Sequence, residues 1–154
     1  HTQTHAYEYA DLLGMGPAYA PDRGQGQDLF MKMNGRKLYE FALQHVPSVI
    51  KTALDKAGVD LAEIRKVLIH QANHKMDVAI LERLFKLYGQ ACPDLDLMPM
   101  TISWLGNSSV ATIPTLLDLL QRGQLANQAI KPGDKVVLAS VGAGMNINAV
   151  VYQF

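Results

Sequence analysis

Two polar side chains stand directly after short apolar runs, where strands of an α/β sheet would end. His70 follows residues 67–69 and opens a His-Gln-Ala-Asn motif, and Asn107 follows residues 100–104 within a Leu-Gly-Asn-Ser-Ser motif. Polar groups at strand exits lie in the crevice where such sheets bind ligands. A neutral imidazole and a carboxamide can each donate a hydrogen bond to one oxygen that becomes negative during a reaction. We therefore expect His70 and Asn107 to converge on a shared acceptor.

A glycine turn follows a third apolar run. Gly142-Ala143-Gly144 comes directly after residues 135–141. Glycine allows a backbone to approach a ligand closely, so a free amide in this turn can serve as a further donor. A Gly-x-Gly pattern alone is weak evidence of a binding site. The alternative is that each of these short motifs has only a structural role.

Other catalytic or metal-binding arrangements are poorly supported. His70 and His74 have the spacing of metal ligands on a helix, but His70 belongs to a strand exit, and Gln71 stands where a zinc protease needs glutamate. We therefore expect no metal site. Cys92 has no helix start behind it to lower its pKa, so it is a poor nucleophile. Ser108 and its neighbour lack the Gly-x-Ser-x-Gly elbow of hydrolases.

Alternating apolar patterns predict the elements that hold these motifs. Apolar residues spaced by three and four predict amphipathic helices, and short runs between turn residues predict strands. The chain reads as α/β with a mixed, mostly parallel five-stranded sheet, helices on both faces and a C-terminal antiparallel hairpin. Helices are expected at residues 36–57, 76–88 and 109–121, and strands within 1–9 and at 66–69, 100–104, 135–141 and 146–152.

Residues 11–33 are interpreted as a loop or lid. The stretch is rich in glycine, proline and aspartate, a composition that resists helix and strand alike. A connection of this length inside a domain is usually functional or disordered. The Gly24-Gln25-Gly26 pair within it is not a phosphate loop, because no strand leads into it.

Composition limits the class of protein. The 154 residues fit one domain, with 14 basic and 14 acidic residues and no net charge, so no basic field for nucleic acid is present. No apolar run has membrane-spanning length. One cysteine excludes an internal disulfide. No partnership with nucleic acid or membrane is expected.

Three motifs together resemble β-ketoacyl-acyl-carrier-protein synthase III, a condensing enzyme of the thiolase fold. They are His70-Gln71-Ala72-Asn73, Leu105-Gly106-Asn107-Ser108-Ser109 and Gly142-Ala143-Gly144. Residues 33–39 and 108–114 also resemble stretches of that family. The similarity runs nearly end to end but covers only the C-terminal half of such an enzyme, so residues 1–154 are interpreted as a single domain, one thiolase-like half.

The resemblance implies roles for individual residues. His70 and Asn107 would hold the malonyl thioester oxygen as an enolate forms, with Asn73 supporting His70. The backbone at Ala143, between Gly142 and Gly144, would help to bind the acyl oxyanion. Lys75 matches a basic position that engages acyl carrier protein. Glu40 departs from the resemblance, because a basic residue is expected at that position.

The resemblance also implies substrates and partners. The complete enzyme would use acyl-CoA and malonyl-acyl-carrier-protein, with no covalently bound cofactor. The expected partners are the N-terminal half of the same enzyme, acyl carrier protein and a second subunit in a homodimer. The family's nucleophilic cysteine belongs to the N-terminal half, which is absent here, so the chain alone is expected to be inactive.

Two hypotheses remain open at this point. The first is a C-terminal domain cut from a synthase III-type acyltransferase of fatty acid biosynthesis, which the start at His1 in place of methionine favours. The second is a non-catalytic half-subunit or binding module that pairs with a separate cysteine-bearing chain or binds acyl carrier protein. The upstream genomic sequence would discriminate between them.

Overall fold

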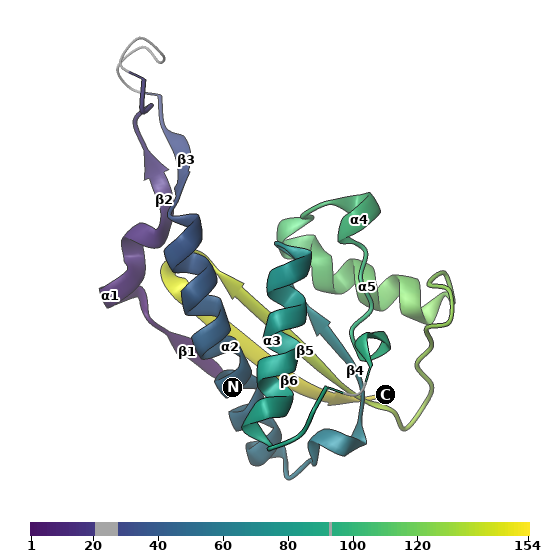
Figure 1. Cartoon of the computed structure of the whole chain (residues 1–154). Coiled ribbons are helices and arrows are strands. Elements are labelled where there is room, and N and C mark those ends of the chain that lie inside the picture. Colours follow the sequence, from purple (N-terminus) through teal and green to yellow (C-terminus); the bar gives the residue numbers. More distant parts are fainter. Residues whose placement is uncertain (21–27, 93) are drawn as a thin grey trace.

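A mixed sheet of four described strands forms the centre of the protein (Figure 1). The computed structural model describes residues 1–20, 28–92 and 94–154. The strand order is β1 (Thr2–Thr4), β6 (Asn146–Gln153), β5 (Lys135–Gly142) and β4 (Ile64–Ile69). β4 and β5 are parallel, whereas β5–β6 and β6–β1 are antiparallel. The α/β class, the mixed sheet and the C-terminal hairpin are thus confirmed.

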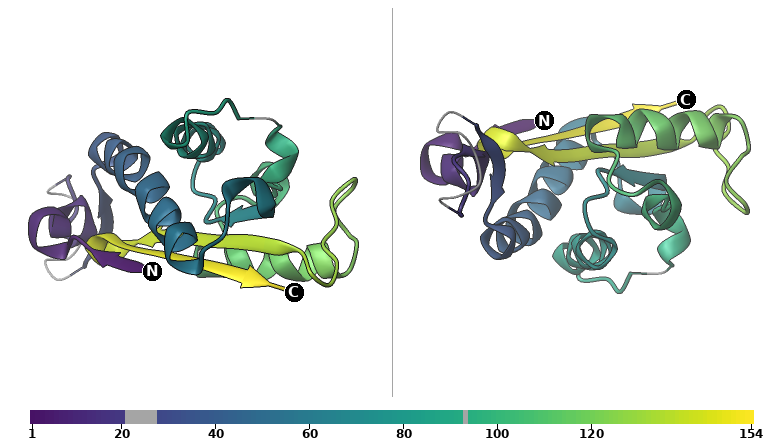
Figure 2. Two further views of the ribbon diagram at one scale, coloured as in Figure 1. Left: turned by 90° about the horizontal axis from the view of Figure 1, so that it is seen from below. Right: turned by 90° about the horizontal axis from the view of Figure 1, so that it is seen from above.

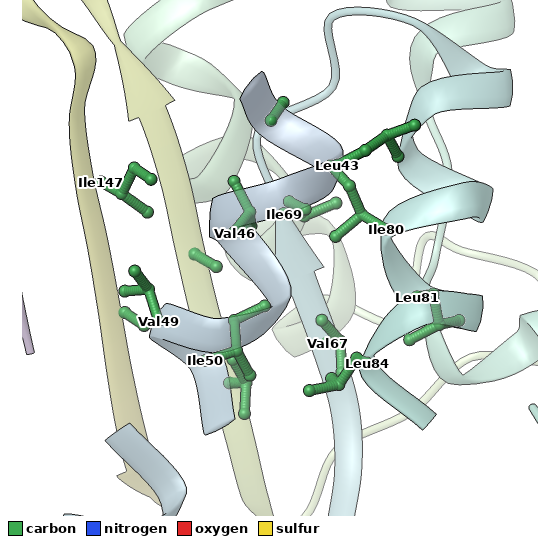
Figure 3. Close-up of a cluster of buried hydrophobic side chains, with 14 of the residues drawn as sticks. Leu43, Val46, Val49, Ile50, Val67, Ile69, Ile80, Leu81, Leu84 and Ile147 are labelled. Carbon is green, nitrogen blue, oxygen red and sulfur yellow. The ribbon is translucent and has the colours of Figure 1, made fainter. Parts of the chain in front are cut away.

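Two long helices cover one face of the sheet. α2 (Gly35–Ala57) and α3 (His74–Leu87) pack over β4, β5 and β6, and their apolar faces meet in the main core (Figure 3). The Asn34 side chain caps α2 by accepting from the Lys37 N–H at 3.3 Å, and Gly58 ends it in the left-handed conformation. The labelled core residues of Figure 3 are Leu43, Val46, Val49, Ile50, Val67, Ile69, Ile80, Leu81, Leu84 and Ile147.

A third helix covers part of the opposite face. α5 (Thr112–Gln121) lies across the sheet from α2 and α3 (Figure 2). Its buried Leu116 and Leu120 pack against Leu68 of β4. Pro114 lies in the first turn of α5. Backbone N–H groups in the first turn have no acceptor within the helix, so proline removes no helical hydrogen bond there. The prediction of helices on both faces is therefore confirmed.

Short elements link these layers. The N-terminal ones are α1 (Ala6–Tyr9), η1 (Ala10–Leu12), β2 (Leu13–Gly16) and β3 (Phe30–Met33). The others are η2 (Leu61–Glu63), η3 (Leu95–Leu97), α4 (Ile102–Leu105), η4 (Ser109–Ala111) and η5 (Ala143–Met145). None of the helices in the described ranges has the length and apolar character needed to cross a membrane.

The expected strand at residues 100–104 is wrong, and the five-stranded, mostly parallel sheet with it. Residues 102–105 form α4 instead, and of the described strand pairs only β4–β5 is parallel. A short apolar run fits helix and strand alike, so the pattern did not discriminate between them. The side chain of Gln71 also bonds the backbone of residues 99–102, which satisfies groups that a strand would present to β4.

The interpretation of residues 11–33 as loop throughout is also wrong. β2 and β3 pair as an antiparallel hairpin that extends away from the main sheet (Figure 1). Glycine-rich composition disfavours strands but does not prevent cross-strand hydrogen bonding in a two-stranded ribbon. The Gly24-Gln25-Gly26 pair lies outside the described residues. A lid function for this segment stays a prediction.

Pro47 sits inside α2, and α3 compensates for the hydrogen bond that it removes. An α-helical N–H at position 47 would bond the carbonyl of Leu43, but proline has no N–H. Arg83 of α3 donates from Nη1 to that carbonyl at 3.2 Å. A guanidinium therefore replaces the missing backbone donor and ties the two helices together.

This compensation predicts a coupling between positions 83 and 47. Arg83→Met should lower the free energy of unfolding by about 1 kcal/mol, since a carbonyl loses its partner. In a Pro47→Ala background the loss should be much smaller, because alanine restores the N–H. Urea denaturation of both variants and the double variant measures the coupling, and Lys86→Met on the same helix is the control. Equal losses from Arg83→Met in both backgrounds would contradict the account.

Candidate active site

His70 continues the β4 strand by one residue. Its backbone N–H donates to the carbonyl of Ala139 in β5 at 2.9 Å. Parallel pairing thus fixes the backbone that carries the imidazole, at the carboxyl end of β4. The side chain is half-buried, and burial lowers the pKa of His70 below its ordinary value, although the hydrogen bond with Ser109 opposes this effect.

The peptide groups of Ser109 bring His70 and Asn107 together. The carbonyl of Ser109 lies 3.2 Å from Nδ1 of His70. The N–H of the same residue donates to Oδ1 of Asn107 at 2.9 Å. Ser109 adopts the left-handed conformation, with φ of 53°, which is uncommon for a residue that carries a side chain. The two predicted site residues are therefore held by one shared neighbour.

The contact with Ser109 decides which ring nitrogen of His70 carries a proton. A carbonyl oxygen only accepts, so Nδ1 must be the donor in this contact. In a neutral ring Nε2 is then unprotonated, so it accepts hydrogen bonds and does not donate them. To donate from Nε2, the ring must be the imidazolium or must release Ser109 and move its proton. The sequence gives no indication of this requirement, because it depends on the backbone of residue 109.

Asn107 uses the oxygen of its carboxamide in a described hydrogen bond, whereas its amide nitrogen is in none. The side chain is exposed, and among the described residues its Nδ2 has no hydrogen-bond partner. Gly106, with φ of 66°, precedes it and ends α4. The Oδ1 bond to Ser109 orients the carboxamide and leaves its two N–H groups available to an external oxygen.

Asn73 and Lys75 lie at the start of α3. Oδ1 of Asn73 caps the helix by accepting from the Met76 N–H at 3.2 Å, and its side chain has no described hydrogen bond to His70. Any support for His70 is therefore indirect, through the position of the helix start. Lys75 is exposed in the first turn of α3, and its role stays a prediction.

The glycine turn contacts the N-terminal segment of the chain. Gly142 ends β5 three residues beyond Ala139, and the turn packs against α1, η1 and β2 (Figure 1). Gly144 has φ of 71°, and the Ala143 carbonyl accepts from Nδ2 of Asn146 at 3.1 Å. The structure therefore shows no described hydrogen bond between this turn and the His70–Asn107 pair.

Two surface hollows are described, and neither is lined by His70 or Asn107. One, of about 450 Å³, lies between residues 95–104 and 124–128. The other, of about 490 Å³, lies between α2 and α3. No cluster of three or more potential metal ligands occurs in the ranges that the structure describes.

Comparison with known proteins identifies the family. Residues 54–154 match the family model described as the C-terminal domain of 3-oxoacyl-[acyl-carrier-protein] synthase III. The chain belongs to this family. The synthase III of Latilactobacillus sakei is 33% identical over 148 residues, and that of Lactobacillus delbrueckii is 39% identical over 119 residues. These matches cover 93% and 77% of this chain but 42% and 34% of the relatives.

The solved structures agree with the thiolase-like fold expected for a synthase III half. The crystal structure of the Thermus thermophilus synthase III superimposes with a TM-score of 0.78 and 29% identity, covering 99% of this chain and 44% of that chain. The chain therefore spans less than half the length of the relatives that it matches.

Cys92 does not have the surroundings of an activated thiol. It lies in the loop after α3, and burial, followed by the charge of Glu82, raises the pKa of its thiol. A raised pKa disfavours the thiolate, which is the nucleophilic form. This agrees with the sequence-based expectation that Cys92 does not supply the synthase III nucleophile.

Asp77 is a buried carboxyl group on α3, one turn after the cap at Asn73. It is fully buried, and among the residues that the structure describes neither carboxylate oxygen has a hydrogen-bond partner. Burial raises the pKa of Asp77 from 3.8 to about 7. The sequence pattern predicted an apolar inner face for this helix and gave no sign of an acid within it.

Asp77 should make stability depend on pH. Between about pH 4 and 7 the folded protein holds a proton that the unfolded chain has lost, so the free energy of unfolding falls as pH rises. The full change is on the order of 4 kcal/mol. Asp77→Asn should remove this slope in urea denaturation at several pH values, whereas exposed Asp11→Asn should keep it. An unchanged slope in Asp77→Asn would show that another group titrates.

Proposed function

We propose that this chain is the C-terminal half of a 3-oxoacyl-[acyl-carrier-protein] synthase III-type acyltransferase of fatty acid biosynthesis. In this proposal His70 and Asn107 stabilise the enolate formed from a malonyl thioester. The observation that supports it best is the double contact of Ser109, whose carbonyl and N–H hold the two side chains at one place. The cytoplasm is the proposed location, as the family resemblance implies.

The proposed chemistry is a decarboxylative condensation. The bond to the malonyl carboxylate breaks, carbon dioxide leaves, and the electron pair passes into an enolate whose oxygen becomes negative. N–H groups placed before the reaction begins stabilise that charge most strongly. Asn107 offers its Nδ2, and His70 offers Nε2 once that atom carries a proton. The enolate carbon then attacks the carbonyl carbon of an acyl thioester held on the cysteine of the N-terminal half, a C–C bond forms, and the C–S bond breaks to release the cysteine as a thiolate.

The remaining expected roles belong to the complete enzyme. We propose acyl-CoA and malonyl-acyl-carrier-protein as substrates with no covalently bound cofactor, Lys75 as a carrier-protein contact, and the backbone of Ala143, between Gly142 and Gly144, as a donor to the acyl oxyanion. The exposed position of Lys75 supports its role as a carrier-protein contact. Asn73 is proposed to support His70 through the start of α3.

We propose that an N-terminal half packs on the sheet face that carries α5, and that the complete enzyme is a homodimer. α5 covers β4, but alternate residues of β6 on that face remain uncovered. Val150 is 49% and Tyr152 50% exposed, and Val110 beside the candidate pair is 91% exposed. Apolar groups gathered on one face are typical of a surface that another domain covers.

The enolate role makes a prediction in the enzyme that includes the N-terminal half. His70→Ala and Asn107→Ala should each slow malonyl decarboxylation by about 100-fold or more, the usual effect of losing one oxyanion donor. Acylation of the cysteine by acyl-CoA should change little. His70→Gln keeps a donor near the Nε2 position and should retain more activity than His70→Asn, which keeps one near Nδ1. Equal loss in both steps would contradict the role.

The isolated chain should be inactive. Purified protein mixed with acyl-CoA should show no acyl-enzyme by mass spectrometry and no condensation product, because Cys92 has a raised pKa and lies in a loop. Cys92→Ser serves as the control for nonspecific thiol acylation. Turnover by the parent chain that disappears in Cys92→Ser would overturn this assignment.

A further inference from the structure

Gln71 is a fully buried amide that uses both ends of its side chain. Nε2 donates to the carbonyl of Pro99 at 2.8 Å. Oε1 accepts from the backbone N–H of Thr101 at 2.8 Å and of Ile102 at 3.0 Å, and from the Thr101 hydroxyl at 3.3 Å. One side chain just after β4 thus bonds three residues, Pro99, Thr101 and Ile102, of a segment about 30 positions later in the chain.

The segment that Gln71 holds leads directly to Asn107. We call residues 99–109 the strap. Its first part does not pair with β4 as a strand, and within the described residues the hydrogen bonds between residues 99–102 and the end of β4 all come from Gln71. Its last residue, Ser109, bonds the neighbouring His70. The strap is therefore fastened at both ends to two adjacent residues.

The positions of these two residues make their roles complementary. His70 and Gln71 are consecutive residues that contact opposite ends of the strap. His70 is half-buried and its ring contacts Ser109, whereas Gln71 is buried and contacts the beginning of the strap. A shift of Gln71 would move the start of α4, and with it Gly106 and Asn107. Ser109 alone fixes only the end of the strap, and its contact with His70 is a single hydrogen bond of 3.2 Å.

We propose that Gln71 is a positioning residue that sets the placement of Asn107 relative to His70. Its carboxamide takes the place of strand pairing between β4 and the strap. The inference rests on the proposed function for its consequence in catalysis, but the placement itself can be measured without a reaction. The alternative is that Gln71 only provides hydrogen-bond partners for buried backbone groups and thereby contributes to stability without positioning Asn107.

The first experiment compares Gln71→Met with the parent 154-residue chain by NMR. Methionine has a similar shape without the hydrogen bonds, and Gln44→Met on the exposed face of α2 is the matched control. Amide exchange at Thr101 and Ile102 should become about tenfold faster, as expected when a buried hydrogen bond is lost. The increase should continue to Gly106 and Ser109, whose N–H groups bond Ile102 and Asn107, and nitrogen shifts of His70 should show loss of the Nδ1–H preference.

A purely structural role gives a different pattern. Faster exchange confined to Thr101 and Ile102, with the His70 tautomer and the Ser109 amide unchanged, would overturn the proposal. Lower thermal stability by itself does not distinguish the two roles, so the His70 tautomer is the deciding signal.

A second variant decides the question where Gln71→Met does not fold. In Gln71→Glu, a neutral carboxylic acid can donate to Pro99 and accept from Thr101 and Ile102, but the ionised form faces the Pro99 carbonyl with an oxygen that cannot donate. Protection of the strap amides, corrected for intrinsic exchange, should therefore be present at low pH and lost as the introduced acid ionises. The absence of such a step relative to the parent would overturn the proposal.

The complete enzyme separates this inference from the proposed function. Gln71→Met should reduce malonyl decarboxylation and leave cysteine acylation unchanged, and Asn107→Ala should add little further loss in the double variant. Additive losses would overturn the proposal. If His70→Ala and Asn107→Ala leave decarboxylation intact, the enolate role fails, but the exchange and tautomer measurements still decide the placement by Gln71.

Discussion

The parallel pairing of β4 with β5 is the constraint on which the candidate site depends. It ends with the hydrogen bond from the His70 N–H to the Ala139 carbonyl, which fixes the position of the imidazole along the sheet. The core formed by α2 and α3 holds β4 in place from one side, and α5 holds it from the other. Asn107 has no such sheet to fix it and reaches His70 through the backbone of Ser109.

Regular, strongly periodic elements were predictable from the sequence. The cap at Asn34, the left-handed Gly58 and the apolar face between them predicted α2, and continuous apolar runs predicted β5 and β6. The run at residues 100–104 was not assigned correctly, because its local pattern fits two structures and the side chain of Gln71 decides between them. A local sequence pattern does not reveal a contact with a residue 30 positions away, such as that between Gln71 and Thr101.

The candidate site shows the same division. His70 and Asn107 were identified from residue type and position, and the structure brings them to a common neighbour. In the sequence, Ser109 was weighed as a possible nucleophile for its hydroxyl, whereas its backbone is the part that contacts both residues. The glycine turn follows a strand as predicted, but β5 runs three residues past the level of His70, so the turn packs against the N-terminal segment.

The left-handed backbone of Ser109 has a consequence for how this site tolerates substitution. Glycine and asparagine adopt that conformation readily, and valine or isoleucine does so only with strain. Residue 109 can therefore exchange its hydroxyl for other small groups during evolution while its amide and carbonyl continue to orient the imidazole and the carboxamide. The restriction at this position therefore comes from the backbone conformation, and not from the chemistry of the side chain.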